Sequence, residues 1–276
     1  MRLRDIRGAV VLATVAMVLV AGCSRLTFVK PNLKRHNERR EAPEYNLRED
    51  DAARKGRMAA TDRVALAEQR LRAGQLDEAD TEIKAALKAD PKSADAYTLM
   101  AMLDEQRGLA TQAGSHYAKA AELAPDRGAQ LNNYGAWLCV NGRAAESLAY
   151  FDRALADPAY ATPAAAMANA GSCALTAGQT ARADRDLRNA LALDPASPVA
   201  LAGMAENEYR AGRYFQARAF SERRLAAAPA TQQVLQLASQ IEQKLGDTAA
   251  AARYVQRMQA EFPEQGRVTR PGDASQ

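Results

Sequence analysis

Small residues and prolines recur in a fixed phase along most of the chain after residue 60. Glycines stand 34, 34, 36, 34 and 34 residues apart, at positions 74, 108, 142, 178, 212 and 246. Two columns of small side chains keep this phase: Ala67, Ala101, Gly135, Gly171, Ala205 and Ser239, and then Ala79, Ala113, Ser147, Ala183, Ala217 and Ala251. Prolines follow at positions 91, 125, 158, 195, 229 and 263. A period of this length predicts six copies of one helix–turn–helix unit.

Each column has a physical role in such a unit. The glycine ends the first helix, where a left-handed backbone is needed and a side chain would be strained. The small residues lie where the two helices cross, so the backbones can approach closely. The proline cannot continue the second helix and sets the break before the next unit. Because each pair buries a face against its neighbour, stability is a sum over interfaces.

This period and pattern match the tetratricopeptide repeat. The match predicts an all-α fold, a right-handed superhelix of about six units. We place the units at 60–93, 94–127, 128–163, 164–197, 198–231 and 232–265, which together form a repeat domain at 60–265. The third unit is two residues longer than the others, around residues 157–160.

The N-terminus carries the pattern of a targeting segment. Three arginines precede an apolar run of 14 residues at 9–22. This run is shorter than the ~20 residues that a membrane-spanning helix needs, so residues 1–22 are predicted to be a cleaved signal peptide. An uncleaved short anchor is the alternative.

Cys23 directly follows the apolar run. The small residues before it resemble a bacterial lipobox, which implies acylation of Cys23 and attachment to a membrane by the lipid. Ser24 after the cysteine favours the outer membrane. Residues 23–59 are then a lipidated N-terminus and linker, and residues 266–276 a disordered tail.

Composition narrows the possible functions. Lys and Arg number 37 against 33 Asp and Glu, giving a net charge of +4 without a basic stripe along the body, so we expect no nucleic-acid partner. Only 5% of residues are aromatic, which disfavours a β-sandwich or barrel. Two histidines and three cysteines are too few for a typical structural zinc site. Phosphate-binding, dinucleotide-binding and zinc-protease motifs are missing, so we expect a non-enzyme with no catalytic residues, metal, cofactor or small-molecule substrate beyond the lipid on Cys23.

The other two cysteines form an even pair once Cys23 carries lipid. Cys139 and Cys173 fall in the first helices of the third and fourth units, which should be neighbours. In an oxidising compartment this placement predicts a disulfide between them. Two buried thiols are the alternative.

The first helices of such an array are expected to line a concave groove that binds a partner. Seven side chains at groove positions are candidates for partner contact: Val64, Leu71, Thr98, Met102, Asn132, Leu175 and Tyr209. Apolar side chains in an exposed groove suit a peptide or a helix. The alternative, that Val64 and Leu71 are simply packed inside, stays open.

Three stretches in the middle of the chain go beyond a general repeat: LNNYGAWLCVNGR at 131–143, FDRALADPAY at 151–160 and NAGSCALTAGQ at 169–179. They resemble the PilF/PilW family of type IV pilus biogenesis lipoproteins, whose members carry Asn-Tyr-Gly…Leu-Cys…Gly and Asn-Ala-Gly-x-Cys-Ala here. With the lipobox and the six units, the resemblance covers nearly the whole chain.

The resemblance implies a pilotin, a lipoprotein at the periplasmic face of the outer membrane. Such a protein binds the type IV pilus secretin and promotes its localisation and multimerisation. An unpaired edge strand of a subunit is an aggregation hazard that a dedicated partner can cover. The rival interpretation is a periplasmic repeat lipoprotein that serves as a scaffold for cell-wall enzymes, with the same fold and another partner.

Overall fold

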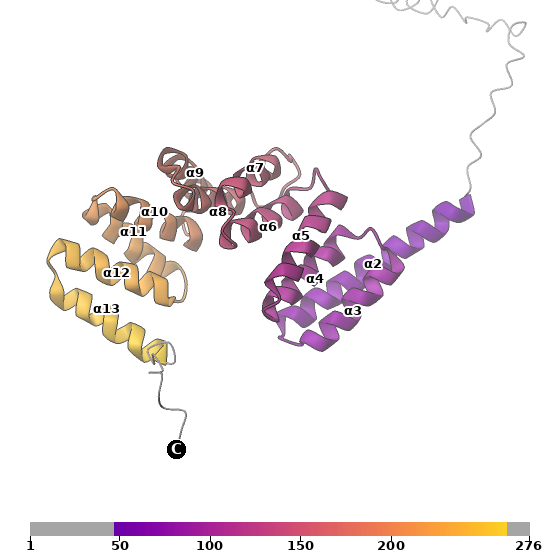
Figure 1. Cartoon of the computed structure of the whole chain (residues 1–276), viewed down its shortest axis with the longest axis horizontal. Helices are drawn as coiled ribbons and strands as arrows, with labels where there is room; N and C mark the ends of the chain where they lie inside the picture. The colour runs from indigo at the N-terminus through magenta and orange to yellow at the C-terminus, as the bar shows by residue number, and fades with distance from the viewer. Residues whose placement is uncertain (1–46, 264–276) are drawn as a thin grey trace, which may run out of the picture. The chain divides into compact units, whose positions relative to one another are not determined.

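The computed structural model describes residues 47–263, which form twelve α-helices and contain no strand (Figure 1). The helices are α2 (Leu47–Arg72), α3 (Leu76–Ala89), α4 (Ala94–Gln106), α5 (Ala110–Leu123), α6 (Gly128–Val140), α7 (Ala144–Leu155), α8 (Pro163–Thr176), α9 (Thr180–Leu193), α10 (Pro198–Arg210), α11 (Tyr214–Ala227), α12 (Gln232–Leu245) and α13 (Thr248–Glu261). They form six consecutive pairs, as the sequence predicts. The predicted signal peptide, Cys23 and the tail at 266–276 lie outside the described residues.

The glycine column ends the first helix of every pair. All six glycines have positive φ angles between 72° and 83°, and no other described residue has a positive φ. At Gly246, φ is 82° and the backbone N–H donates to the Gln243 carbonyl at 3.1 Å, closing α12. Other side chains rarely adopt this conformation, so the period of the sequence comes directly from a backbone requirement.

The small-residue columns lie at the helix crossings, and large residues of the second helices fill the space beside them. The ring of Phe151 on α7 lies against Gly135 on α6, and Leu187 on α9 lies against Gly171 on α8. Both large side chains are fully buried. Each pair also packs on the first helix of the next pair, and α8 contacts the first helices on both sides, α6 and α10.

The linker prediction is wrong for residues 47–59. Helix α2 begins at Leu47 and continues unbroken through the first unit to Arg72. At Gly56 an added Cβ would lie 2.6 Å from the Ala89 carbonyl oxygen, so α2 meets the end of α3 through bare backbone. A contact made by glycine leaves no apolar periodicity in the sequence, which explains why this helical extension is not predicted. None of the described helices is long and apolar enough to cross a membrane.

The two extra residues of the third unit lie in the turn between α7 and α8. There the Asp157 carboxylate accepts hydrogen bonds from the backbone N–H groups of Gly128, at 2.8 Å, and Ala159, at 2.9 Å. Tyr160 packs against Gly128, where an added Cβ would come within 2.6 Å of the tyrosine ring. The insertion is therefore attached to the start of α6.

These hydrogen bonds, donated by Gly128 and Ala159, hold the pKa of the Asp157 carboxyl below its ordinary value of 3.8. A lowered pKa in the folded state means that the carboxylate stabilises the fold above that ordinary value and that this contribution is lost as the pH falls. We therefore expect Asp157→Asn to melt below the wild type near pH 6, with the two melting curves converging as the pH falls below the ordinary pKa of 3.8. Circular dichroism melts over a pH series measure this. The exposed neighbour Asp126→Asn is the control, and a pH-independent difference for Asp157→Asn would contradict the assignment.

Candidate protein-binding surface

The first helices carry the residues predicted to contact a partner, but the structure separates these residues by burial. Leu71 is only 4% exposed and packs with Ile83 and Leu103 in the core of the first two units. Half-buried Val64 packs on the same cluster. The prediction of Leu71 as a contact residue is therefore wrong: the end of α2 is covered by α3 and α4, and the alternative of simple packing holds.

Two further candidates are buried for similar reasons. Thr98 donates its hydroxyl hydrogen to the Ala94 carbonyl one turn earlier, at 3.0 Å, and contributes little surface. Leu175 packs in the core formed by α7, α8, α9 and α10. Both predictions are wrong, because neither side chain has the exposed surface that a partner contact needs.

Met102 and Tyr209 remain accessible, at 37% exposure for Met102 and half-buried for Tyr209. Two exposed valines on first helices, Val140 and Val199, add apolar surface. We call the accessible side chains at groove positions of the first helices the first-helix face: Met102, Val140, Val199 and Tyr209. Asn132, another predicted contact residue, is buried at 9% exposure, so that prediction is wrong as well. Phe215, on the second helix α11, is also exposed, and the sequence pattern does not signal it.

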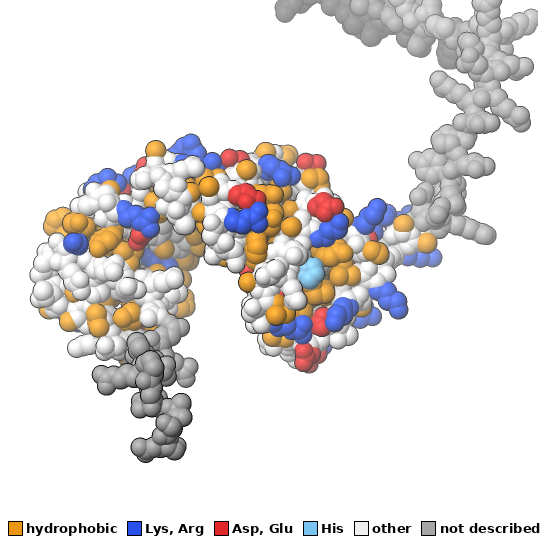
Figure 2. All heavy atoms as spheres, viewed as in Figure 1, with side chains coloured by type: hydrophobic (Ala, Val, Ile, Leu, Met, Phe, Trp, Pro, Cys, Tyr) orange, Lys and Arg blue, Asp and Glu red, His pale blue; other side chains and the backbone are white. Residues whose placement is uncertain are grey.

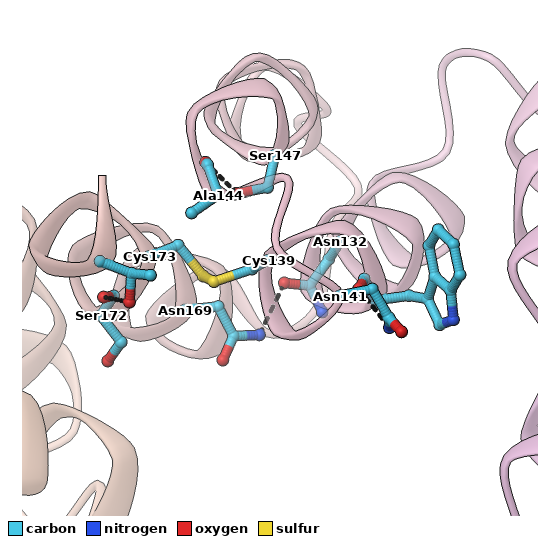
Figure 3. The surroundings of a disulfide bond; sticks show 10 residues. Asn132, Cys139, Asn141, Ala144, Ser147, Asn169, Ser172 and Cys173 are labelled. Carbon is cyan, nitrogen blue, oxygen red and sulfur yellow. Dashed lines mark hydrogen bonds between the residues drawn. A yellow bond between two sulfur atoms is a disulfide. The ribbon is translucent and has the colours of Figure 1, made fainter. Parts of the chain in front are cut away.

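The predicted disulfide is present in the structure. Cys139 on α6 is bonded to Cys173 on α8, with the two Cα atoms 5.8 Å apart (Figure 3). It joins the first helices of adjacent units, so it fixes the distance between α6 and α8 at this point.

A pair of amide side chains bridges the same two helices. Asn169 Nδ2 on α8 donates to Asn132 Oδ1 on α6 at 3.0 Å (Figure 3). Asn132 is among the predicted contact residues, whereas the bridge to Asn169 is not predicted. The two residues do not occupy equivalent positions of consecutive units, so the sequence carries no signal for this pairing.

Ion pairs also occur in the C-terminal units. Arg210 pairs with Glu206 at 2.6 Å and also donates to the Leu175 carbonyl, at 3.1 Å. The buried carboxylates Glu208 and Glu242 are paired with Arg213 and Arg218. On the face shown in Figure 2, acidic and basic side chains are interspersed over the described residues. Paired charges therefore lie beside the apolar side chains of the first-helix face near α10.

A cavity lies at the junction between the second and third units. The cavity, of about 460 Å³, opens between α5 and α6, bordered by Tyr134, Trp137 and Arg143. The Trp137 ring covers Gly114, where an added Cβ would lie 2.2 Å from the ring, so the indole packs the junction between the second and third units.

Among residues 47–263, no group of three or more His, Cys, Asp or Glu side chains could hold a metal ion.

Comparison with known proteins identifies the family. No protein-family model matches the chain. Over 193 residues the chain is 26% identical to the type IV pilus assembly protein PilF of Pseudomonas aeruginosa, covering 70% of this chain and 77% of PilF. The crystal structure of PilW, a widely conserved type IV pilus biogenesis factor, matches with a TM-score of 0.67 and 33% identity, over 74% of this chain and 94% of PilW. The chain belongs to the PilF/PilW family.

The resemblance seen in the middle of the sequence is thus confirmed, and this PilF/PilW protein is a tetratricopeptide-repeat protein of type IV pilus biogenesis. The repeat architecture has independent support. A tetratricopeptide repeat protein from Parabacteroides merdae has a TM-score of 0.57 at 16% identity, over 74% of this chain and 80% of that one. Such low identity shows the fold alone, and it confirms the predicted fold class.

Proposed function

We propose that this PilF/PilW protein is a pilotin, anchored by a lipid on Cys23 at the periplasmic face of the outer membrane. There it binds the type IV pilus secretin and promotes secretin localisation and multimerisation. The observation that carries the proposal is the structural match to PilW, a type IV pilus biogenesis factor, which covers 94% of the PilW chain. Its action is non-catalytic, through protein contacts alone.

The first-helix face offers a surface for a subunit that is not yet assembled. Met102, Val140 and Val199 are accessible apolar side chains on α4, α6 and α10, whereas the apolar residues around them are buried in the cores. A secretin subunit awaiting assembly has unpaired strand edges and apolar surface that a partner can cover. Met102 lies nearest the N-terminal units, where we expect the contact.

Replacing Met102 with glutamate is expected to weaken secretin binding by about tenfold or more, because a carboxylate would be buried in an apolar contact. The helical circular dichroism spectrum should not change, since the side chain is exposed. Met58→Glu is a matched control, because Met58 is an exposed methionine on α2, at 64% exposure. Titration of each variant with purified secretin measures the affinity. Equal affinities of the two variants would place the contact elsewhere.

The decisive test of the function is the state of the secretin in membranes of a strain that lacks this protein. An unboiled gel with immunoblotting should show loss of the high-mass multimer, restored by the wild type and not by the non-lipidated Cys23→Ala. Intact multimers in the outer membrane would reject the pilotin proposal. The chain would then be better described as a repeat scaffold with another client, such as a cell-wall enzyme.

A further inference from the structure

Four cations gather where the first helix pair ends. At this point α2 and α3 meet through backbone, since an added Cβ at Gly56 would lie 2.6 Å from the Ala89 carbonyl oxygen. Two of the cations flank Gly56 on α2, one directly precedes Ala89 on α3, and one lies in the turn after α3. All four side chains are exposed, and we call them the basic end: Lys55, Arg57, Lys88 and Lys92. In Figure 2 basic side chains gather over α2 and α3.

The charges of the basic end are not neutralised by ion pairs. Within residues 51–263 no carboxylate forms a salt bridge with any of the four cations, whereas Arg54 on the same helix pairs with Asp51. The next acids along the chain are Asp62 on α2 and Asp90 after α3, and the Asp90 carboxylate already accepts a hydrogen bond from the backbone N–H of Lys92, at 3.0 Å. Two acids do not balance four cations, so this surface is locally positive.

The local excess of positive charge stands out from the rest of the chain. Residues 51–276 contain equal numbers of basic and acidic residues, whereas seven basic and five acidic residues stand at 23–50, directly before the basic end. Leu47 follows Cys23 by 24 residues, and a fully extended segment of this length spans at most about 85 Å. A lipid on Cys23 would therefore keep the basic end within reach of the bilayer that holds the lipid.

We propose that the basic end binds the phosphate headgroups of an anionic phospholipid bilayer and so holds the first repeat unit against the membrane. The inference rests on the proposed lipid anchor, because a chain already tethered to a surface meets it at high effective concentration, where weak contacts suffice. Each lysine or arginine beside an anionic membrane strengthens binding by about fivefold, and the attraction fades within a Debye length of the surface. Met102 lies on α4, in the unit next to the one held there, so a client would be met close to the bilayer.

Vesicle sedimentation tests the charge requirement. The mature chain that begins at Cys23, with that thiol blocked, is mixed at low salt with vesicles of equal parts phosphatidylglycerol and phosphatidylcholine. Lys55→Gln with Arg57→Gln should weaken binding by about tenfold or more, because two cations of the basic end are lost. The matched control is Lys244→Gln with Arg253→Gln, an exposed lysine and an exposed arginine on α12 and α13, and it should bind as the wild type does. Vesicles of phosphatidylcholine alone should bind none of these proteins.

Tryptophan quenching then locates the contact in the anchored protein. Because the other two cysteines are bonded to each other, the Cys23 thiol can be coupled to a maleimide lipid, which supplies the anchor chemically. Tryptophan is introduced at Ala53, exposed on α2 beside the basic end, or at the control position Ala219, exposed on α11. In anionic vesicles, brominated phospholipids should quench Ala53→Trp and leave Ala219→Trp as bright as in phosphatidylcholine. Trp137 is the only native tryptophan, and the wild type measures its background.

The outcomes separate the membrane contact from the proposed function, because the anchor in these experiments does not depend on the cell. Equal binding by the two double variants, with melting temperatures equal to that of the wild type, would overturn the contact, and so would an unquenched Ala53→Trp in anionic vesicles. Either result together with loss of secretin multimers in the deletion strain would overturn the contact alone. Intact multimers in that strain would reject the pilotin, while the predicted vesicle results would still support the contact.

Discussion

Removing the disulfide by the double substitution Cys139→Ala and Cys173→Ala is expected to lower the free energy of unfolding by about 3–4 kcal/mol. The bond closes a loop with a sequence separation of 34 residues, and in the chain-entropy model closing such a loop restricts mainly the unfolded chain. Alanine is the suitable replacement because Cys173 is buried, and a serine hydroxyl there would add an unsatisfied polar group. Urea denaturation of the oxidised wild type and the variant measures the difference.

Reductant provides the matched control for this prediction. The wild type in reductant should unfold at nearly the same urea concentration as the double variant, and the variant should not respond to reductant. Because repeat stability is a sum over neighbouring interfaces, amide exchange should accelerate mainly in α6 to α9 and much less in α12 and α13. A wild type indifferent to reductant would contradict the predicted contribution.

The fold could be predicted from the sequence at positions where the backbone conformation or a helix crossing allows only one kind of residue. A left-handed turn selects glycine at Gly142 and Gly178, and the crossings select small residues at Ala113 and Ala183. The start of α2 follows no such rule, because its contact with α3 is made by backbone at Gly56. The pattern therefore predicts the six pairs and misses the helical extension.

The binding surface was harder to predict because burial depends on the neighbouring unit. Leu71 and Met102 both occupy groove positions of first helices, yet Leu71 is covered by Ile83 and Leu103, while Met102 stays accessible. The pairing of Asn132 with Asn169 likewise depends on how α6 and α8 are spaced. Nothing in either helix alone specifies this distance.

A buried arginine shows the same dependence on context. Arg224 occupies a position where the first four units have alanine and the sixth has Met258, and it is buried. Its guanidinium donates to the carbonyls of Ala228 and Pro229 at the end of α11, at 3.1 and 3.2 Å. Cations are favourable at a helix C-terminus, so the charge is accommodated locally. The sequence shows only that this unit departs from the pattern.

Replacing Gly171 with leucine is expected to lower the free energy of unfolding by about 3 kcal/mol, at the upper end of the usual effect of overpacking. A Cβ at this position would lie 2.6 Å from Leu187 Cγ and 3.0 Å from the Leu187 backbone nitrogen. Leu187 is fully buried and packed in the core of the fourth unit, so neither it nor its backbone can move aside cheaply. Higher helix propensity favours leucine over glycine by about 1 kcal/mol, which only partly offsets the clash.

Two further variants separate the clash from other effects of the new side chain. Ala165→Leu adds leucine to the same helix at an exposed position and should leave the urea midpoint nearly unchanged. Combining Gly171→Leu with Leu187→Ala should cost less than the sum of the single effects, because the smaller residue makes room at the crossing. Strict additivity, or a Gly171→Leu midpoint equal to that of the wild type, would show that α8 and α9 do not cross at this residue. The register of the whole array would then need revision, because the glycine and alanine columns share one phase.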